Sequence, residues 1–111
     1  MIIAIPMVQD QLSLHFGHCE KFRLFTVDEG KNIVSFEDKT PPPHEPGVLP
    51  KWLSDEKASV IITGGMGMHA QRLFEQYGIQ VQIGAKPGKP EDVAKAWLAG
   101  NLDIGANPCD H

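Results

Sequence analysis

The residues best suited to chemistry form one short run near the N-terminus and another at the C-terminus. The runs are His15-Phe16-Gly17-His18-Cys19 and Cys109-Asp110-His111. Imidazole nitrogen and thiolate sulfur are the ligands that zinc, copper, iron and metal sulfide clusters prefer. The sequence therefore predicts metal ligands at His15, His18, Cys19, Cys109 and His111.

Each of these residues also has a purely structural interpretation. A loop histidine often only hydrogen-bonds the backbone, and a free cysteine often only fills a small apolar space. The last three residues would equally suit a disordered end. The chain has no C-x-x-C, no H-E-x-x-H and no repeated cysteine pair. The spacing therefore indicates neither a zinc ribbon nor a cysteine-ligated iron-sulfur cluster.

A second candidate is the glycine-rich turn Thr63-Gly64-Gly65-Met66-Gly67-Met68-His69-Ala70, between a buried strand and a helix. Gly65, Gly67 and Ala70 fit the G-x-G-x-x-A spacing, in which backbone amides and a helix N-terminus hold an anion. His69 falls in the first helical turn at the same opening. The same glycines would also serve a tight turn with close helix packing. Dinucleotide binding is disfavoured, because Gly84-Ala85-Lys86 follows the next strand where an acidic residue is expected.

A catalytic role for Cys19 is a third hypothesis. Cys19 is the one nucleophile with neighbouring bases, His15 and His18, but adjacent residues point apart unless the loop turns, so the pattern establishes no dyad. The acidic residues form no pair with distinct acid and base roles and suit a solvated surface. We therefore expect a binding protein and not an enzyme.

These candidates depend on a predicted alternation of strands and helices. Apolar or alternating runs predict strands at 1–8, 21–28, 32–37, 58–63 and 79–83. Apolar residues with helical spacing predict helices from Val48, from Met68 to about Tyr77, and from Pro90 to Leu98. The second and third strands should form a hairpin, and the strands on either side of the second helix should be parallel. The fold class is α/β, with a mixed sheet of about five strands.

Two segments lack a regular pattern. Residues 40–47 contain four prolines, which exclude helix and inner strand and predict a stiff exposed loop around His44. That loop would serve as a connector or as a docking surface. Residues 101–111 show no periodicity and are expected to form a flexible tail of a single domain spanning 1–111.

Composition narrows the possible partners. The chain has 111 residues, of which 41% are hydrophobic and 22% charged, so it can bury a core without disulfides or a structural metal, and a bound metal would be cargo. The net charge of −4, without a basic stripe, argues against nucleic acid. The apolar N-terminus lacks a basic leader and a membrane-length run, so we expect a cytoplasmic protein with reduced cysteines and no membrane partner.

Taken together, these segments resemble the dinitrogenase iron-molybdenum cofactor biosynthesis family. The resemblance covers Met1 to about Gly100 and lies in the opening strand 1–6, His15-Phe16-Gly17, the aromatic strand 22–25, the strand and glycine turn 60–67, and residues 77–81. Its members include the accessory proteins NifX and NafY, the C-terminal part of NifB, and stand-alone domains such as the molybdenum-copper orange protein.

The resemblance implies a ribonuclease-H-like three-layer α/β/α fold with a mixed five-stranded sheet. It also implies a non-catalytic nitrogenase accessory protein that carries a preformed metal-sulfur cluster, iron-molybdenum or molybdenum-copper, between donor and acceptor proteins. Within the family pattern, His15-Phe16-Gly17 would contact the cluster, whereas the thiols are features of some stand-alone members.

With the cargo that the resemblance implies, we expect the turn formed by Gly64, Gly65 and Gly67, with His69, to cradle a negatively charged thiometallate. The alternative is a nucleotide- or phosphate-binding module that uses the same turn, from Gly64 to Ala70.

Overall fold

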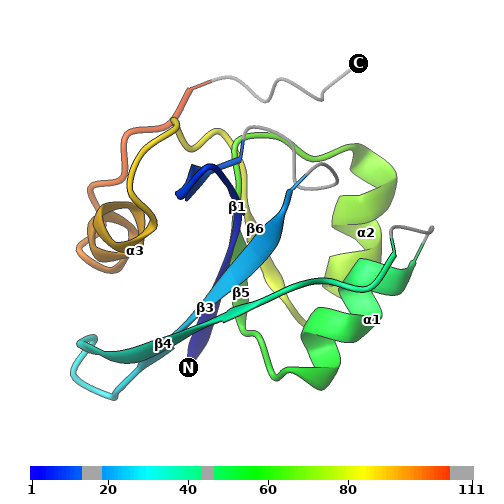
Figure 1. The fold of residues 1–111 in the computed structure, drawn as a ribbon, viewed down its shortest axis with the longest axis horizontal. Helices are drawn as coiled ribbons and strands as arrows, with labels where there is room; N and C mark the ends of the chain where they lie inside the picture. The colour runs from blue at the N-terminus through cyan, green and yellow to red at the C-terminus, as the bar shows by residue number, and fades with distance from the viewer. Residues whose placement is uncertain (14–18, 44–46, 106–111) are drawn as a thin grey trace.

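A mixed β-sheet runs through the computed structural model, which describes residues 1–13, 19–43 and 47–105 (Figure 1). Its strands are β1 (Ile2–Val8), β2 (Gln11–Leu12), β3 (Lys21–Val27), β4 (Ile33–Lys39), β5 (Val60–Ile62) and β6 (Gln80–Gln82). The strand order is β4-β3-β1-β5-β6, and β2 pairs with the end of β1. The predicted mixed sheet is confirmed, and within the described residues it has six strands where about five were expected. The two-residue β2 was missed because it is too short to show a periodic pattern.

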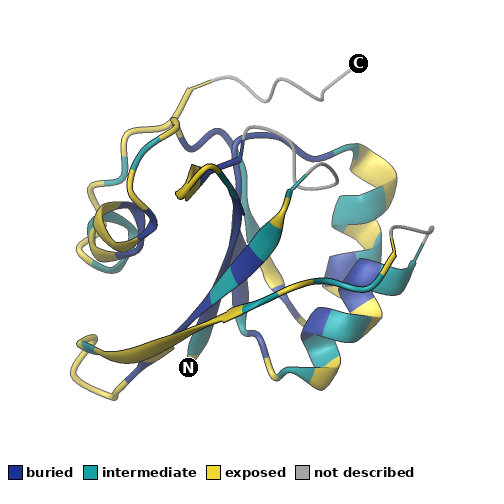
Figure 2. Ribbon diagram, viewed as in Figure 1, coloured by how far each residue is buried: buried dark blue, intermediate teal, exposed yellow. Residues whose placement is uncertain are grey.

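In the part of the chain that the structure describes, three helices pack against this sheet: α1 (Val48–Asp55), α2 (Met68–Gln76) and α3 (Pro90–Leu98). Helices α1 and α2 cover one face and α3 covers the other (Figure 1). On the first face, Leu53 and Phe74 pack with Phe22 of β3, and on the second, Val93 packs with Phe25. The buried positions follow the central strands and the inner sides of the helices (Figure 2). None of the helices in the described ranges is long and apolar enough to cross a membrane.

The predicted pairings are confirmed. Strands β3 and β4 form an antiparallel hairpin, whose turn is closed by the Asn32 N–H donating to Asp28 Oδ1 at 2.9 Å. Strands β5 and β6 are parallel and are joined by α2, and β5 is also parallel to β1. The buried β3 side chains divide between the two faces, with Phe22 and Leu24 in the core on the α1/α2 side and Phe25 and Val27 in the core on the α3 side.

The second helix lies where the sequence predicts it, and it ends one residue before the approximate end that was expected. Helix α2 ends at Gln76, and Gly78 follows in the left-handed region with φ 74°. Tyr77, which follows the last helical residue, is 44% exposed, whereas Phe74 is fully buried on the inner side of α2. Gly78 ends the helix as expected, because glycine adopts this conformation without steric cost.

Candidate functional site

The carboxyl ends of β1, β5 and β6 lie at one end of the sheet because the three strands are parallel. We call this end, with the turns 63–67 and 83–86 that follow β5 and β6, the carboxyl edge. Strand β5 pairs with β1 only at Ile3 and Ala4, and beyond them β1 pairs instead with β2, at Met7 and Val8. Strands that part in this way at their carboxyl ends are the usual place for a ligand in an open α/β sheet.

Ser13 fixes the start of the histidine-containing run to the glycine turn. Its N–H donates to the Pro6 carbonyl at 2.8 Å, and its carbonyl accepts from the Gly64 N–H at 3.3 Å. The Thr63 hydroxyl also points at this carbonyl, at 3.5 Å, and both Ser13 and Thr63 are buried. The ends of β1, β2 and β5 are therefore joined at a single residue. His15, Phe16, Gly17 and His18, which were predicted as site residues, lie outside the described residues.

Cys19 lies where the chain re-enters the sheet. The next residue, Glu20, donates its N–H to the Met7 carbonyl at 2.8 Å, and Cys19 itself packs partly buried against the α1/α2 core. Burial raises the pKa of the Cys19 thiol to about 11, so the sulfur is protonated at neutral pH. A catalytic thiol needs a lowered pKa, so this environment disfavours the hypothesis of a cysteine nucleophile. Metal ligation here would have to displace the proton.

The glycine turn provides part of the predicted anion cradle. Gly64 is already engaged on both sides, because its N–H binds Ser13 and its carbonyl accepts from the Gly84 N–H at 2.8 Å. Gly67 caps α2 in an extended conformation (φ −66°, ψ 156°) without a side-chain cap, which leaves first-turn amides without acceptors in the helix. His69, in that turn, is exposed.

Close packing does not explain the glycine at position 67. Among the residues that the structure describes, a Cβ atom placed there would have no neighbouring heavy atom within 4 Å, and its φ is one that any residue adopts. The interpretation of these glycines as packing devices therefore finds no support at Gly67.

The C-terminal part of the chain returns to the same edge. The Gly105 N–H donates to the Gly84 carbonyl at 2.6 Å, and Ala85 forms an antiparallel bridge with Ile104. Backbone hydrogen bonds thus connect four distant segments one after another, from Ser13 to Gly64, from Gly64 to Gly84 and from Gly84 to Gly105. Cys109 and His111 follow Gly105 along the chain and lie outside the described residues.

The predicted metal ligands can be followed only in part. Of the residues proposed as ligands, Cys19 alone belongs to the part of the chain that the structure describes. Within that part, no three His, Cys, Asp or Glu side chains gather to hold a metal ion. Sequence reasoning included Thr63 in the glycine turn without giving its hydroxyl a role, and it missed Ser13 and Gly84, which organise the edge through backbone groups. The available signal in the sequence was a serine and a threonine, each placed directly after an apolar residue.

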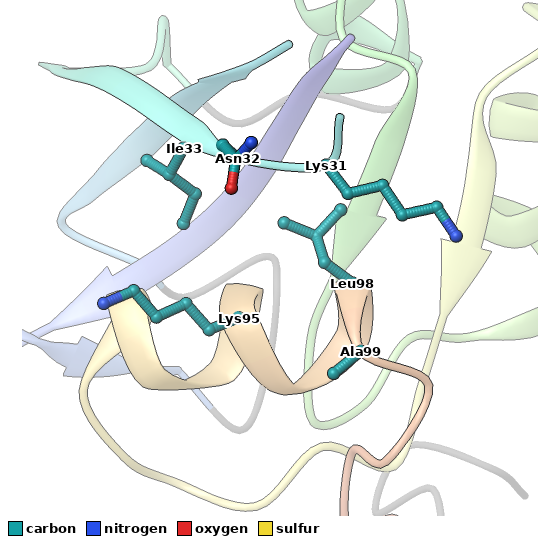
Figure 3. Close-up of a pocket in the computed structure, with 6 residues that line it drawn as sticks. All are labelled: Lys31, Asn32, Ile33, Lys95, Leu98 and Ala99. Atoms are coloured by element: carbon teal, nitrogen blue, oxygen red, sulfur yellow. The ribbon is translucent and has the colours of Figure 1, made fainter. Parts of the chain in front are cut away.

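A groove of about 330 Å³ lies elsewhere, between the β3–β4 turn and α3 (Figure 3). It is lined by Lys31, Asn32, Ile33, Lys95, Leu98 and Ala99. The side chains of Lys31 and Lys95 extend in opposite directions in Figure 3, and Lys95 pairs with Glu91 at 3.0 Å. The groove therefore has an apolar floor but no converging polar groups.

Comparison with known proteins agrees with the resemblance found in the sequence. A family model described as "Dinitrogenase iron-molybdenum cofactor" matches residues 1–100. The crystal structure of PH0822 is 34% identical, covers 94% of each chain and superimposes with a TM-score of 0.86. The apo orange protein of Desulfovibrio gigas shares the fold, with 21% identity, 96% and 94% coverage and a TM-score of 0.74. The uncharacterized protein MJ0580 of Methanocaldococcus jannaschii is 28% identical over 107 residues, 93% of this chain and 90% of that protein.

Proposed function

The chain belongs to the dinitrogenase iron-molybdenum cofactor family, and on that premise we propose that it binds a preformed metal-sulfur cluster at the carboxyl edge. The cluster, of the iron-molybdenum or molybdenum-copper type, is cargo that the protein receives from a donor protein and delivers to an acceptor protein. The family match supports this class of cofactor, and the high pKa of the Cys19 thiol favours a carrier over a cysteine enzyme.

The observation that carries the proposal is the row of hydrogen bonds through Ser13, Gly64, Gly84 and Gly105. It ties together the points from which the predicted ligand-bearing segments begin. His15 follows Ser13 by two residues and Cys109 follows Gly105 by four, spans that cannot exceed about 7 Å and about 14 Å when fully extended. Soft ligands from distant parts of the sequence are therefore within reach of one edge.

In this proposal the residues have complementary roles. The soft ligands coordinate or shield the metal, and they are His15, His18, Cys19, Cys109 and His111. The amides of the turn at Gly65 and Gly67, with the N-terminus of α2 and His69, attract the negative charge of a thiometallate. Phe16 and Gly17, which belong to the same family motif as His15, would also contact the cluster.

The architecture supports the fold description that accompanies this role. Helices on both faces of a mixed sheet, with a hairpin on one side and parallel strands on the other, suit a ribonuclease-H-like three-layer domain. We propose that residues 1–111 act as a single carrier domain.

Loading with a thiometallate tests the proposal. Purified, reduced protein would be incubated with tetrathiomolybdate, alone and with copper or iron, and desalted before the visible spectrum and bound metal are measured. We expect a stoichiometric chromophore that a His15→Ala, Cys19→Ala double variant does not retain. His44→Ala is the matched control, because His44 is not among the proposed ligands, and it should load normally. No retention by the wild-type protein, or equal retention by the double variant, would overturn the proposal.

A nucleotide- or phosphate-binding module is the second candidate, and the uncapped N-terminus of α2 beside Gly67 favours it. The engagement of the Gly64 N–H by Ser13 counts against a full phosphate cradle. Thermal unfolding distinguishes the two, because only a ligand that binds the native state raises the melting temperature. Stabilisation by nucleotides but not by thiometallates would favour the nucleotide- or phosphate-binding function over cluster binding.

A further inference from the structure

Strand β4 is an outer edge of the sheet, and it is exposed along almost its whole length. It pairs with β3 on one side, and within the described residues no strand lies on its other side. Five consecutive residues, 34–38, are exposed, as the colour of β4 in Figure 2 shows. Among them, Val34 and Phe36 are large apolar side chains with 59% and 56% exposure. An exposed edge strand of this length is a template for pairing with another strand.

The hydrogen bonds of the sheet establish which backbone groups of β4 point outward. Val27 exchanges two backbone hydrogen bonds with the N-terminal residue, at 2.8 and 3.0 Å, so every second β3 residue before it also bonds to β1. Leu24 lies between those residues and therefore bonds to its β4 partner, Glu37. Phe36 and Asp38, on either side of Glu37, consequently direct their N–H and C=O groups away from the sheet.

Phe36 is an ordered apolar anchor at the middle of this edge. Its ring centroid lies 6.0 Å from that of Phe25 and 4.3 Å from the guanidinium carbon of Arg23. Arg23 is held in turn by two hydrogen bonds to Asp38. A side chain that is already ordered loses little conformational entropy when a partner covers it. Aromatic and arginine side chains are also enriched at the centres of protein interfaces.

The sequence of β4 is complementary to itself when a two-fold axis passes through Phe36. Two antiparallel copies of β4 then place the two Phe36 side chains opposite each other, so that apolar surface covers apolar surface. Each Glu37 lies opposite Ser35 of the second copy. No two charges of like sign face each other directly in this register, which like-charge repulsion across a sheet would otherwise destabilise.

Neighbouring positions of the axis are less favourable. An axis at Glu37 or at Asp38 would place that carboxylate directly opposite its own copy. An axis at Ser35 would place Asp38 opposite Asn32, whose N–H and C=O are already bonded to Asp28 in the hairpin turn. Of these four positions, only the axis at Phe36 avoids both costs.

We propose that β4 is a homodimer interface, in which two copies of this chain pair β4 with β4 in antiparallel orientation about Phe36. The N–H and C=O groups of the two Phe36 residues exchange hydrogen bonds, and the two sheets become one. A contact made by a single strand is expected to bury less than the roughly 1,200 Å² of a standard interface, so the dimer is weak and depends on concentration. Each copy has a net charge of −4, so salt should strengthen the association.

This inference does not rest on the proposed function. Strands β3 and β1 separate β4 from β5, so the interface lies away from the turns of the carboxyl edge. The two-fold axis reverses the strand direction, so the two carboxyl edges lie at opposite ends of the joined sheet and both stay open. Thiometallate loading should therefore be the same in the monomer and the dimer, and a failure to load would leave the dimer inference intact.

Sedimentation equilibrium from micromolar to millimolar concentration tests the inference on the wild-type protein, Phe36→Lys and Tyr77→Lys. Tyr77 is the matched control because it is an aromatic residue, 44% exposed, that lies outside β4. We expect the average mass of the wild-type protein and of Tyr77→Lys to rise toward twice the monomer mass. Phe36→Lys should stay monomeric, because its two lysines would face each other at the axis.

Two results of this experiment would overturn the inference. A wild-type protein that stays monomeric throughout would leave the edge of β4 to an extended segment of another protein. A Phe36→Lys variant that dimerises as strongly as Tyr77→Lys would place the dimer contact on another face of the molecule.

Amide hydrogen exchange in the wild-type protein provides a second measurement, which decides the question if Phe36→Lys does not fold. The Glu37 amide is bonded to β3 in every copy, whereas the Phe36 amide points to solvent in the monomer. We expect exchange at Phe36 to slow about tenfold when nine-tenths of the protein is dimeric, while exchange at Glu37 changes little. Exchange at Phe36 that is independent of concentration would contradict pairing through β4.

Discussion

The carboxyl edge and the β3–β4 hairpin differ in what they offer a ligand. The groove between the hairpin turn and α3 has a volume of about 330 Å³, but its lysine side chains diverge and its floor is apolar. The carboxyl edge instead brings together strand ends, a helix N-terminus and backbone groups from distant parts of the chain. Empty space is therefore a poorer guide to the site here than the convergence of polar groups.

The topology explains this difference. A hairpin satisfies its own turn, as the hydrogen bonds between Asp28, Lys31 and Asn32 show, so few backbone groups remain for a ligand. Parallel strands must be joined by long connections, which leave at one edge and return at the other. The turns after β1, β5 and β6 therefore accumulate at the carboxyl edge.

The largest expected effect is a loss of unfolding free energy when a phenylalanine is removed next to the carboxyl edge and not in the hairpin. Phe74, in the helix that follows the glycine turn, is fully buried. Phe36, in the hairpin, is 56% exposed. Phe74→Ala should lower the free energy of unfolding by about 3–5 kcal/mol, because it leaves a cavity in the core. Phe36→Ala should cost about 1 kcal/mol or less, mainly through its contact with Arg23, whose guanidinium carbon lies 4.3 Å from the ring centroid. Urea unfolding measures both, and equal losses would contradict the burial pattern.

The next effect concerns the reactivity of Cys19. With a pKa of about 11 in place of 9.0, the thiolate population at pH 8 should be about a hundredfold below that of an unperturbed thiol. A Cys109→Ser variant isolates Cys19, and its alkylation by iodoacetamide should be about a hundredfold slower in the folded than in the urea-unfolded protein. Fast alkylation of the folded form at pH 8 would restore the hypothesis of a cysteine nucleophile.

Side-chain patterns predicted most of the fold. The alternation along Lys21–Val27 places Phe22 and Phe25 in opposite cores, as expected, and Pro90 opens α3. These features depend on local periodicity and on the fixed φ of proline, so they are visible in the sequence. Tyr77 fits the helical spacing equally well, but it lies just after the last residue of α2 and is exposed.

The candidate site was less predictable because backbone groups organise it. The carbonyls of Ser13, Gly64 and Gly84 connect its parts, and every residue type has a carbonyl. Residues 102–105 show no periodicity, yet they dock through the space that Gly84 leaves. Spacing identified the glycine turn, but it could not show that the Gly64 N–H is engaged by Ser13.

A smaller effect is expected at the hydroxyl that supports the carboxyl edge. The Thr63 Oγ1 atom is buried and lies 3.5 Å from the Ser13 carbonyl oxygen and 3.4 Å from that of Gly65. Thr63→Val keeps the shape but removes these long hydrogen bonds, so it should cost about 1 kcal/mol of unfolding free energy. Thr26→Val, at an exposed position in β3, is the control and should be near neutral. If the two variants were equally stable, Thr63 would have no organising role at the edge.

The smallest expected effect is on stability in acid, and it tests whether the Arg23–Asp38 ion pair of the hairpin has only a structural role. Arg23 donates two hydrogen bonds to Asp38, at 2.7 and 2.9 Å, and these lower the pKa of the Asp38 carboxyl. The pair therefore stabilises the fold above the unfolded-state pKa of about 3.9, and this contribution is lost as the pH falls through the lower folded-state pKa. When the pH is lowered from 5 to 2, the free energy of unfolding of the wild-type protein should fall by up to about 1 kcal/mol more than that of Asp38→Asn. The difference is small because both side chains of the pair are partly exposed. Urea unfolding across that range measures the difference. Thiometallate retention at neutral pH should be the same for both proteins, and a loss in Asp38→Asn would extend the site to the hairpin.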